Sequence, residues 1–178
     1  MMKKAMCFIL CTVLLLCLAA CGGKDDQINP ETNSNATAKP GTDSVAEDAF
    51  VTDGVALSIG GTIQDGDLAP LGNPTDVQSA PSCHYDGNDT IYIYDGLTVY
   101  TYSDKDDEVV YLIEITNESY AAYKNTKIGM NVDEIKSVLG EPADETAIAV
   151  IYDISDDTTL RFSVSDSTVT MIEYEERI

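Results

Sequence analysis

Tryptophan is absent from this chain, and histidine and positive charge are scarce. The sequence has no Trp, one His, and 10 Lys and Arg residues against 31 Asp and Glu residues, which gives a formal net charge of −21. A protein this acidic repels nucleic acid and anionic lipid head groups. We therefore expect no nucleic-acid partner.

Cysteine is scarce outside the N-terminal segment. Cys7, Cys11 and Cys17 lie within that segment, Cys21 follows it, and only Cys83 comes later. A chain cleaved before Cys21, with the Cys21 thiol itself modified, would therefore contain no internal disulfide. Cys83 has His84 beside it but no Lys or Arg, so we expect a buried, inert thiol.

The one long apolar run of the chain lies at its start. Lys3 and Lys4 precede residues 5–20, an uncharged run of about 16 residues, whereas a membrane-spanning helix needs roughly 20. The run ends in Leu-Ala-Ala at residues 18–20. A charged start, a short apolar core and small residues before a cleavage site are typical of an export signal. Residues 1–20 are therefore predicted to be a signal peptide.

Residues 18–21, Leu-Ala-Ala-Cys, resemble the lipobox of bacterial lipoproteins. The resemblance implies a diacylglyceryl group on Cys21 and cleavage before it. Two acyl chains hold a protein stably on a membrane. We expect the chain to be anchored through the lipid on Cys21, at the extracytoplasmic face of the cell membrane.

A change in composition near residue 50 divides the rest of the chain. Residues 21–50 are predicted to be a lipidated, disordered tether, because they have too few large apolar side chains to offset the entropy of ordering. Residues 51–178 are long enough for a domain with its own core. We divide that domain into two repeats, about 51–116 and 117–178.

An imperfect internal repeat underlies this division. Leu-Gly-Asn-Pro-Thr-Asp at 71–76 matches Leu-Gly-Glu-Pro-Ala-Asp at 139–144. We therefore predict an α+β fold, a tandem repeat of a short helical segment plus a three-stranded antiparallel meander, with the helices packed on one face of the sheet. The predicted strands are 90–94, 97–103 and 108–116 in the first copy, and 147–153, 158–164 and 168–173 in the second.

The second copy carries the clearer helix signals. Asn131 and Glu134 have the spacing of a capping box, and Gly140 is placed to end the helix in the left-handed conformation. In the first copy, residues 61–71 contain Gly66 and Pro70, so we expect one or two helical turns at most. The residues predicted to share the buried face of the second helix are Val132, Ile135, Val138 and Leu139.

Residues 127–135, Lys-Ile-Gly-Met-Asn-Val-Asp-Glu-Ile, together with Leu-Gly-Glu-Pro at 139–142, resemble a motif of two protein groups. These are the small lipoproteins of the outer-membrane barrel-assembly machinery and the beta-lactamase inhibitory proteins, which repeat the unit. The doubled form is similar to uncharacterised lipoproteins of Gram-positive anaerobes. The resemblance implies a fold but no activity. The inhibitors have disulfides, which this chain would lack, so beta-lactamase inhibition is not expected.

No catalytic residue, cofactor or metal site is predicted. The sequence has no nucleophile elbow, phosphate-binding glycine loop or zinc-ligand spacing. The acidic runs at 104–108 and 155–157 lack the spacing of a calcium loop and are expected to be solvated turns. We therefore predict a protein that is not an enzyme. The alternative is a divalent-ion-binding protein or an enzyme that uses the acidic loops.

Tyrosine is the abundant aromatic residue, with ten copies, all after residue 50. If Asp95-Gly96 forms a two-residue primed turn, Tyr92 and Tyr94 share one face of the hairpin. Tyr100 and Tyr102 then lie on the other face, and Tyr111 can lie beside them. Exposed aromatic patches often mark interaction sites, although tyrosine also simply suits strands.

We predict that Tyr100, Tyr102 and Tyr111 bind a partner, an envelope protein or another surface ligand. In the alternative assignment, Tyr92 and Tyr94 are the exposed pair. The sequence as a whole predicts a non-catalytic, lipid-anchored, extracytoplasmic binding module.

Replacing Cys21 by Ser tests the predicted anchor. The variant lacks the thiol that would carry the lipid, so we expect it to lose incorporation of a fatty-acid label and to leave the membrane fraction. Cys83→Ser is the matched control and should keep both properties. Undiminished labelling of Cys21→Ser would contradict the assignment.

Overall fold

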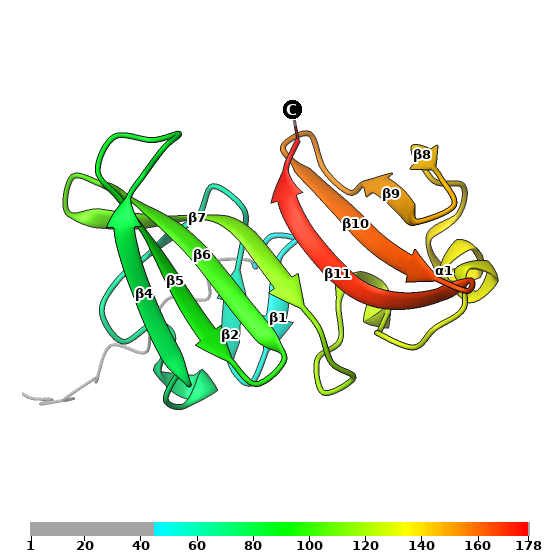
Figure 1. Cartoon of the computed structure of the whole chain (residues 1–178), viewed down its shortest axis with the longest axis horizontal. Coiled ribbons are helices and arrows are strands. Elements are labelled where there is room, and N and C mark those ends of the chain that lie inside the picture. Colours follow the sequence, from blue (N-terminus) through cyan, green and yellow to red (C-terminus); the bar gives the residue numbers. More distant parts are fainter. Residues whose placement is uncertain (1–44, 178) are drawn as a thin grey trace, which may run out of the picture. The chain divides into compact units, whose positions relative to one another are not determined.

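The computed structural model describes residues 45–177. The predicted signal peptide, Cys21 and most of the predicted tether lie outside the described residues. The described part contains eleven β-strands, one α-helix and two 3₁₀ turns (Figure 1). In chain order these are β1 (Phe50–Thr52), β2 (Val55–Leu57), β3 (Thr62–Ile63), η1 (Ala69–Leu71), β4 (Asp76–Pro81), β5 (Asn88–Tyr94), β6 (Leu97–Asp104), β7 (Asp107–Ile115), η2 (Tyr123–Asn125), α1 (Val132–Leu139), β8 (Asp144–Glu145), β9 (Ala149–Asp153), β10 (Thr158–Ser165) and β11 (Thr168–Glu176).

Nine of the strands form one antiparallel sheet. Its order is β4-β5-β6-β7-β11-β10-β9-β8, and β3 also pairs with β7. Two strands share the side of β7 that faces away from β6. The beginning of β7 pairs there with β3, and its end pairs with β11. The strands β1 and β2 form a separate hairpin, which Figure 1 shows behind the sheet.

One face of the sheet forms the hydrophobic core. Strand side chains alternate between the two faces, so the buried residues of β6 lie at every second position. The hairpin β1–β2 and the helix α1 add their apolar side chains to the same cluster, and the ring of Phe50 meets that of Tyr174 edge to face at 5.9 Å. The fully buried members from the central strands are Leu97, Val99, Ile113, Ile115, Leu160, Phe162, Ile172 and Tyr174.

The predicted α+β tandem repeat is wrong. The described part is mostly antiparallel sheet and has one helix of seven or more residues, so a unit of helix plus meander is not repeated. The 61–71 segment forms only the turn η1, because Gly66 and Pro70 disfavour a longer helix. Strands β4 and β8 also extend the two predicted three-stranded meanders to four strands each.

The predicted start of α1 is confirmed. The Asn131 side chain accepts a hydrogen bond from the Asp133 N–H at 2.9 Å, and the Glu134 carboxylate accepts one from the Asn131 N–H at 2.8 Å. Together they form the capping box. The predicted buried face is wrong at one position: Ile135 is buried, but Val138 is 42% exposed.

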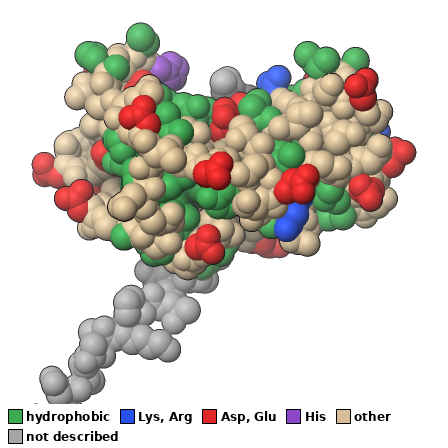
Figure 2. All heavy atoms as spheres, turned by 60° about the horizontal axis from the view of Figure 1, so that its bottom comes forward, with side chains coloured by type: hydrophobic (Ala, Val, Ile, Leu, Met, Phe, Trp, Pro, Cys, Tyr) green, Lys and Arg blue, Asp and Glu red, His purple; other side chains and the backbone are tan. Residues whose placement is uncertain are grey.

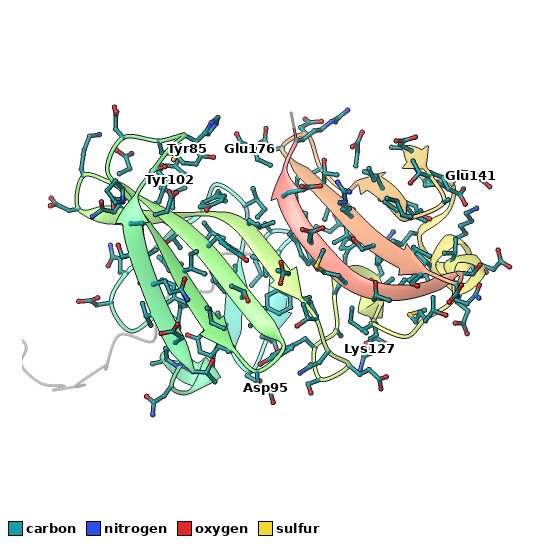
Figure 3. All side chains as sticks on the ribbon, viewed as in Figure 1. Tyr85, Asp95, Tyr102, Lys127, Glu141 and Glu176 are labelled. Atoms are coloured by element: carbon teal, nitrogen blue, oxygen red, sulfur yellow. The ribbon has the colours of Figure 1, made fainter. Side chains whose placement is uncertain are left out.

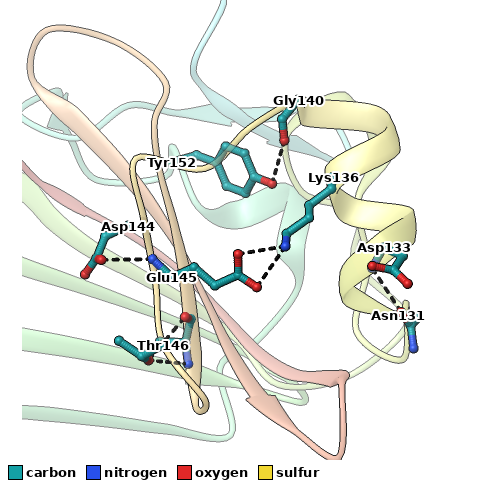
Figure 4. A network of polar contacts seen from close by, with 9 residues as sticks. Asn131, Asp133, Lys136, Gly140, Asp144, Glu145, Thr146 and Tyr152 are labelled. Atoms are coloured by element: carbon teal, nitrogen blue, oxygen red, sulfur yellow. Dashed lines mark hydrogen bonds and ion pairs between the residues drawn. The ribbon is translucent and has the colours of Figure 1, made fainter.

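The end of α1 is held by Gly140 (Figure 4). Its φ of +88° is positive, but its ψ of −155° lies far outside the left-handed helical region, so the predicted left-handed conformation is wrong. This pair of angles falls in a region that is essentially open only to glycine. The Gly140 N–H donates to the Lys136 carbonyl at 2.8 Å. The Tyr152 hydroxyl donates to the Gly140 carbonyl at 3.0 Å and so ties this turn to β9.

The hairpin between β5 and β6 has the predicted register. Tyr94 pairs with Leu97 and Tyr92 pairs with Val99, so Asp95 and Gly96 form a two-residue turn. Of these two turn residues, only Gly96 has a positive φ, of +79°. Both primed turns require a positive φ at the first central residue, so the prediction of a primed turn is wrong.

Both outermost strands of the sheet carry an aspartate that covers their own backbone. Asp76 on β4 accepts the Val77 N–H at 2.9 Å, and Asp144 on β8 accepts the Glu145 N–H at 2.9 Å. Each aspartate ends one copy of the Leu-Gly-x-Pro-x-Asp sequence. The repeated sequence therefore performs the same local task at both edges of the sheet.

Replacing Gly140 by Ala tests the backbone constraint at the end of α1. A β-carbon would meet no atom within 4 Å there, so the cost is conformational rather than steric. We expect unfolding to become easier by about 1–3 kcal/mol in chemical denaturation. Glu141→Ala, at the exposed neighbouring position, should change stability by less than about 0.5 kcal/mol. Equal stability of both variants would contradict the assigned role of Gly140.

Candidate functional site: a tyrosine platform on the outer sheet face

Four tyrosines gather on the outer face of the sheet, which is the face opposite the core. Tyr85 stacks on Tyr102 with ring centroids 3.7 Å apart and planes 7° from parallel. Tyr111 lies 5.6 Å from Tyr85, 6.3 Å from Tyr102 and 6.0 Å from Tyr100. All four are half-buried. We call Tyr85, Tyr100, Tyr102 and Tyr111 the tyrosine platform.

Local features of three segments bring the four rings together. Alternation along β6 places Tyr100 and Tyr102 on one face while Val99 and Thr101 are buried on the other. The β6–β7 register shifts between Tyr100 and Thr101, so that Tyr111 is the extra residue of a β-bulge. A bulge re-aims a side chain, and here it brings Tyr111 beside its neighbours on β6.

The fourth ring comes from the loop between β4 and β5. The Ser82 hydroxyl accepts hydrogen bonds from the N–H groups of His84 and Tyr85, at 3.2 and 2.9 Å. The Ser82 N–H in turn donates to the Gly87 carbonyl at 3.0 Å. These bonds fold the loop back, and Figure 3 shows Tyr85 beside Tyr102, near the end of β11 that carries Glu176.

Aliphatic side chains continue the platform across the sheet. Ile91 is the cross-strand partner of Tyr100 on β5, and Leu112 is its partner on β7. Ile93 lies two residues along β5 on the same face. All three are half-buried. The first half of the outer face is therefore apolar and aromatic, and no helix or hairpin of residues 45–177 is packed on it (Figure 1).

Carboxylates border the platform. Asp89 pairs across the strands with Tyr102, and Glu176 accepts a long hydrogen bond of 3.4 Å from the Tyr85 hydroxyl. Burial raises the pKa of Tyr85, and the charge of Glu176 raises it further. Burial also raises the pKa of Tyr111, with Asp89 as the next cause. Tyr85 and Tyr111 are therefore kept as neutral phenols in a negative surrounding.

One carboxylate oxygen of Asp89 has no hydrogen-bond donor within residues 45–177. This atom, Oδ1, is buried. A buried acceptor without a donor costs free energy, so this oxygen adds to the cost of folding the negative border of the platform.

The second half of the outer face is charged. Glu114 on β7 and Glu173 on β11 lie directly opposite each other, and Glu175 is two residues further along β11. Burial raises the pKa of Glu173, whose side chain is 16% exposed, and the charge of Glu175 adds to this. The Arg161 guanidinium compensates weakly, because its Nε lies 3.7 Å from the carboxylate. Acidic side chains also outnumber basic ones on the surface seen in Figure 2.

The structure brings the predicted residues Tyr100, Tyr102 and Tyr111 together on the outer face. In the alternative assignment Tyr92 and Tyr94 would be exposed, but Tyr94 is buried and Tyr92 packs against the core. Sequence reasoning missed Tyr85, because its position depends on a loop and a stacking contact. The Ser82-x-x-Tyr85 spacing, typical of a hydroxyl-capped turn, was the available signal.

The other predicted chemistry has simple outcomes. Cys83 is exposed in the β4–β5 loop, so its predicted burial is wrong. Within residues 45–177, no group of three His, Cys, Asp or Glu side chains could hold a metal ion. No helix in the same range is long and apolar enough to cross a membrane. Cys21 lies outside the described residues.

Comparisons with known proteins add little. No family model and no curated protein matches the chain. A crystal structure of a DUF4309 family protein, YjgB from Bacillus subtilis, has a TM-score of 0.48 and 15% identity, covering 74% of this chain and 89% of that one. The uncharacterised protein YfeY from Escherichia coli has a TM-score of 0.42 and 13% identity, covering 67% and 92%. Similarities this distant support no inference about function, and the resemblance to the inhibitory proteins and barrel-assembly lipoproteins stays a prediction.

Replacing Glu173 by Gln tests the electrostatics of the outer face. The folded state raises the Glu173 pKa above its ordinary value of 4.5, so folding is penalised once the group ionises. This loss of stability is absent below the ordinary pKa. It grows as the pH rises from the ordinary pKa through the raised pKa of the folded state. We expect Glu173→Gln to have a higher Tm than the parent protein at pH 7, and the difference to shrink towards pH 4. A difference in Tm that does not depend on pH would contradict this assignment. The control is Asp156→Asn, at an exposed position.

Proposed function

We propose that this chain is a non-catalytic, lipid-anchored, extracytoplasmic module that binds a protein partner through the tyrosine platform. The observation that carries the proposal is the gathering of Tyr85, Tyr100, Tyr102 and Tyr111 on an uncovered sheet face. Tyrosines provide large contact areas at low entropic cost and keep a polar tip for hydrogen bonding. The lipid anchor is supported by the lipobox-like sequence that ends in Cys21.

The chemistry of the platform specifies the partner. Its centre is aromatic and aliphatic, whereas its borders carry Asp89, Glu176 and the acidic group around Glu173. The complementary surface has an apolar centre and a basic rim. A lysine or arginine of that rim would be attracted by the negative charge of Asp89 and Glu176. We therefore assign a basic protein surface as the partner.

A double replacement, Tyr100→Ser with Tyr102→Ser, tests the platform. Because the two rings are half-buried and lie outside the main core, we expect the variant to fold and its affinity for the partner to fall at least tenfold. The partner is first identified in cells that make the full chain with a photo-crosslinking residue in place of Thr98, which lies on the same face of β6. Binding is then measured with the isolated full chain and the purified partner.

Two controls give the result its meaning. Ile151 lies on the outer face of the other half of the sheet, so Ile151→Ser should leave the affinity for the partner unchanged. A crosslinker at Ala147, an exposed position beyond that half, should not capture the same protein. Affinity should fall as salt rises from 50 to 300 mM. A folded double variant with unchanged binding contradicts the proposal, and so does a loss of several kcal/mol of stability, which would make the rings structural.

A further inference from the structure

A cleft on the core side of the sheet is separate from the tyrosine platform. Its volume is about 510 Å³, and it lies between the 63–74 segment, β5 and the β6–β7 turn. Pockets of roughly 300–1,000 Å³ are typical of small-molecule sites. Leu68, Pro74 and Tyr94 are among its apolar lining residues, while Asp65, Asp106 and Glu108 supply its carboxylates.

One of these carboxylates is held in place. The hydroxyls of Tyr92 and Thr101 both donate to Oε2 of Glu108, at 2.8 and 2.9 Å. Oε1 of Glu108 receives none of the hydrogen bonds formed among residues 45–177, so it remains available as an acceptor. Burial, and then the hydrogen bond to Glu108, raise the pKa of Tyr92, which keeps this phenol a donor.

The lining of the cleft has no positive charge. It contains no lysine or arginine, and the three ion pairs of residues 45–177 use other acids. Its carboxylates are also not gathered as metal ligands, since residues 45–177 hold no such group of three. The cleft thus combines an apolar, aromatic wall with oriented acceptors, and an occupant must bring donors and positive charge.

We propose that this cleft binds a small organic cation, with a primary ammonium or guanidinium head on a short apolar body. The head donates to Oε1 of Glu108 and is attracted by Asp65 and Asp106. The uncharged body lies against Leu68, Pro74 and the ring of Tyr94. This site is independent of the tyrosine platform, because Tyr92 and Tyr94 point to the opposite face of β5 from Ile91 and Ile93.

Titration of the full chain in a zwitterionic detergent tests the proposal. The probe is pentylammonium, and its uncharged and anionic matches are 1-pentanol and pentanoate. We expect pentylammonium to shift the NMR signals of the Leu68 methyl groups and the Tyr94 ring in a saturable way, at millimolar concentration. Pentanol should bind at least fivefold more weakly, and pentanoate should not bind.

Replacing single carboxylates of the cleft shows which of them bind the ammonium group of the probe. Glu108→Gln should weaken pentylammonium at least fivefold, and Asp106→Asn, at an exposed position, should weaken it to a smaller extent without affecting folding. Asp156→Asn is the matched control, because it removes an exposed acid outside the cleft. Equal binding of pentanol and pentylammonium overturns the proposal. Full binding by Asp106→Asn and Glu108→Gln overturns it as well, whereas the platform variant Tyr100→Ser with Tyr102→Ser should bind the probe normally.

Discussion

The pairing of β7 with β11 determines the rest of the structure. Four residue pairs join the two meanders into one sheet. Ile113 with Tyr174 and Ile115 with Ile172 meet on the core side of this pairing. Because side chains alternate, the same register must place Glu114 opposite Glu173 on the outer side. The core thus imposes a repulsive carboxylate pair, and the free energy of apolar burial offsets its cost.

The two halves of the outer face differ as a result of this single pairing. On one side of it, Ile91, Tyr100 and Leu112 form a continuous apolar row. On the other side, Glu173 and Arg161 form a charged row. An apolar patch and an acidic patch are thereby held side by side on one rigid sheet. A surface that binds by apolar contact and selects by charge needs both.

Local signals in the sequence predicted the elements that local forces determine. The capping box of α1 and the 94–97 hairpin register depend on neighbouring residues, and the structure has both. The alternation along β6 likewise placed Tyr100 and Tyr102 on the correct face. These features could be predicted because the responsible residues are within a few positions of one another.

Features that depend on distant residues could not be predicted in this way. All six residues of β4 are exposed, so the strand has no hydrophobic alternation, and pairing with β5 alone reveals it. Residues 61–71 form only η1, within the one or two helical turns predicted there, and the described part is a sheet with one helix where an α+β repeat was expected. The cleft was also missed, since Leu68, Tyr94 and Glu108 are brought together only by the folded chain.

The aspartates at the two sheet edges restrict how other molecules can meet this domain. An uncovered edge strand invites a further strand from another chain, through backbone hydrogen bonds that are indifferent to sequence. Asp76 and Asp144 already occupy an edge N–H on each side and place a negative charge there. Lipid anchoring would concentrate many copies of the chain on one membrane surface. Unrestricted pairing of edge strands between these copies would then lead to polymerisation. The guarded edges therefore disfavour the addition of further strands to this sheet.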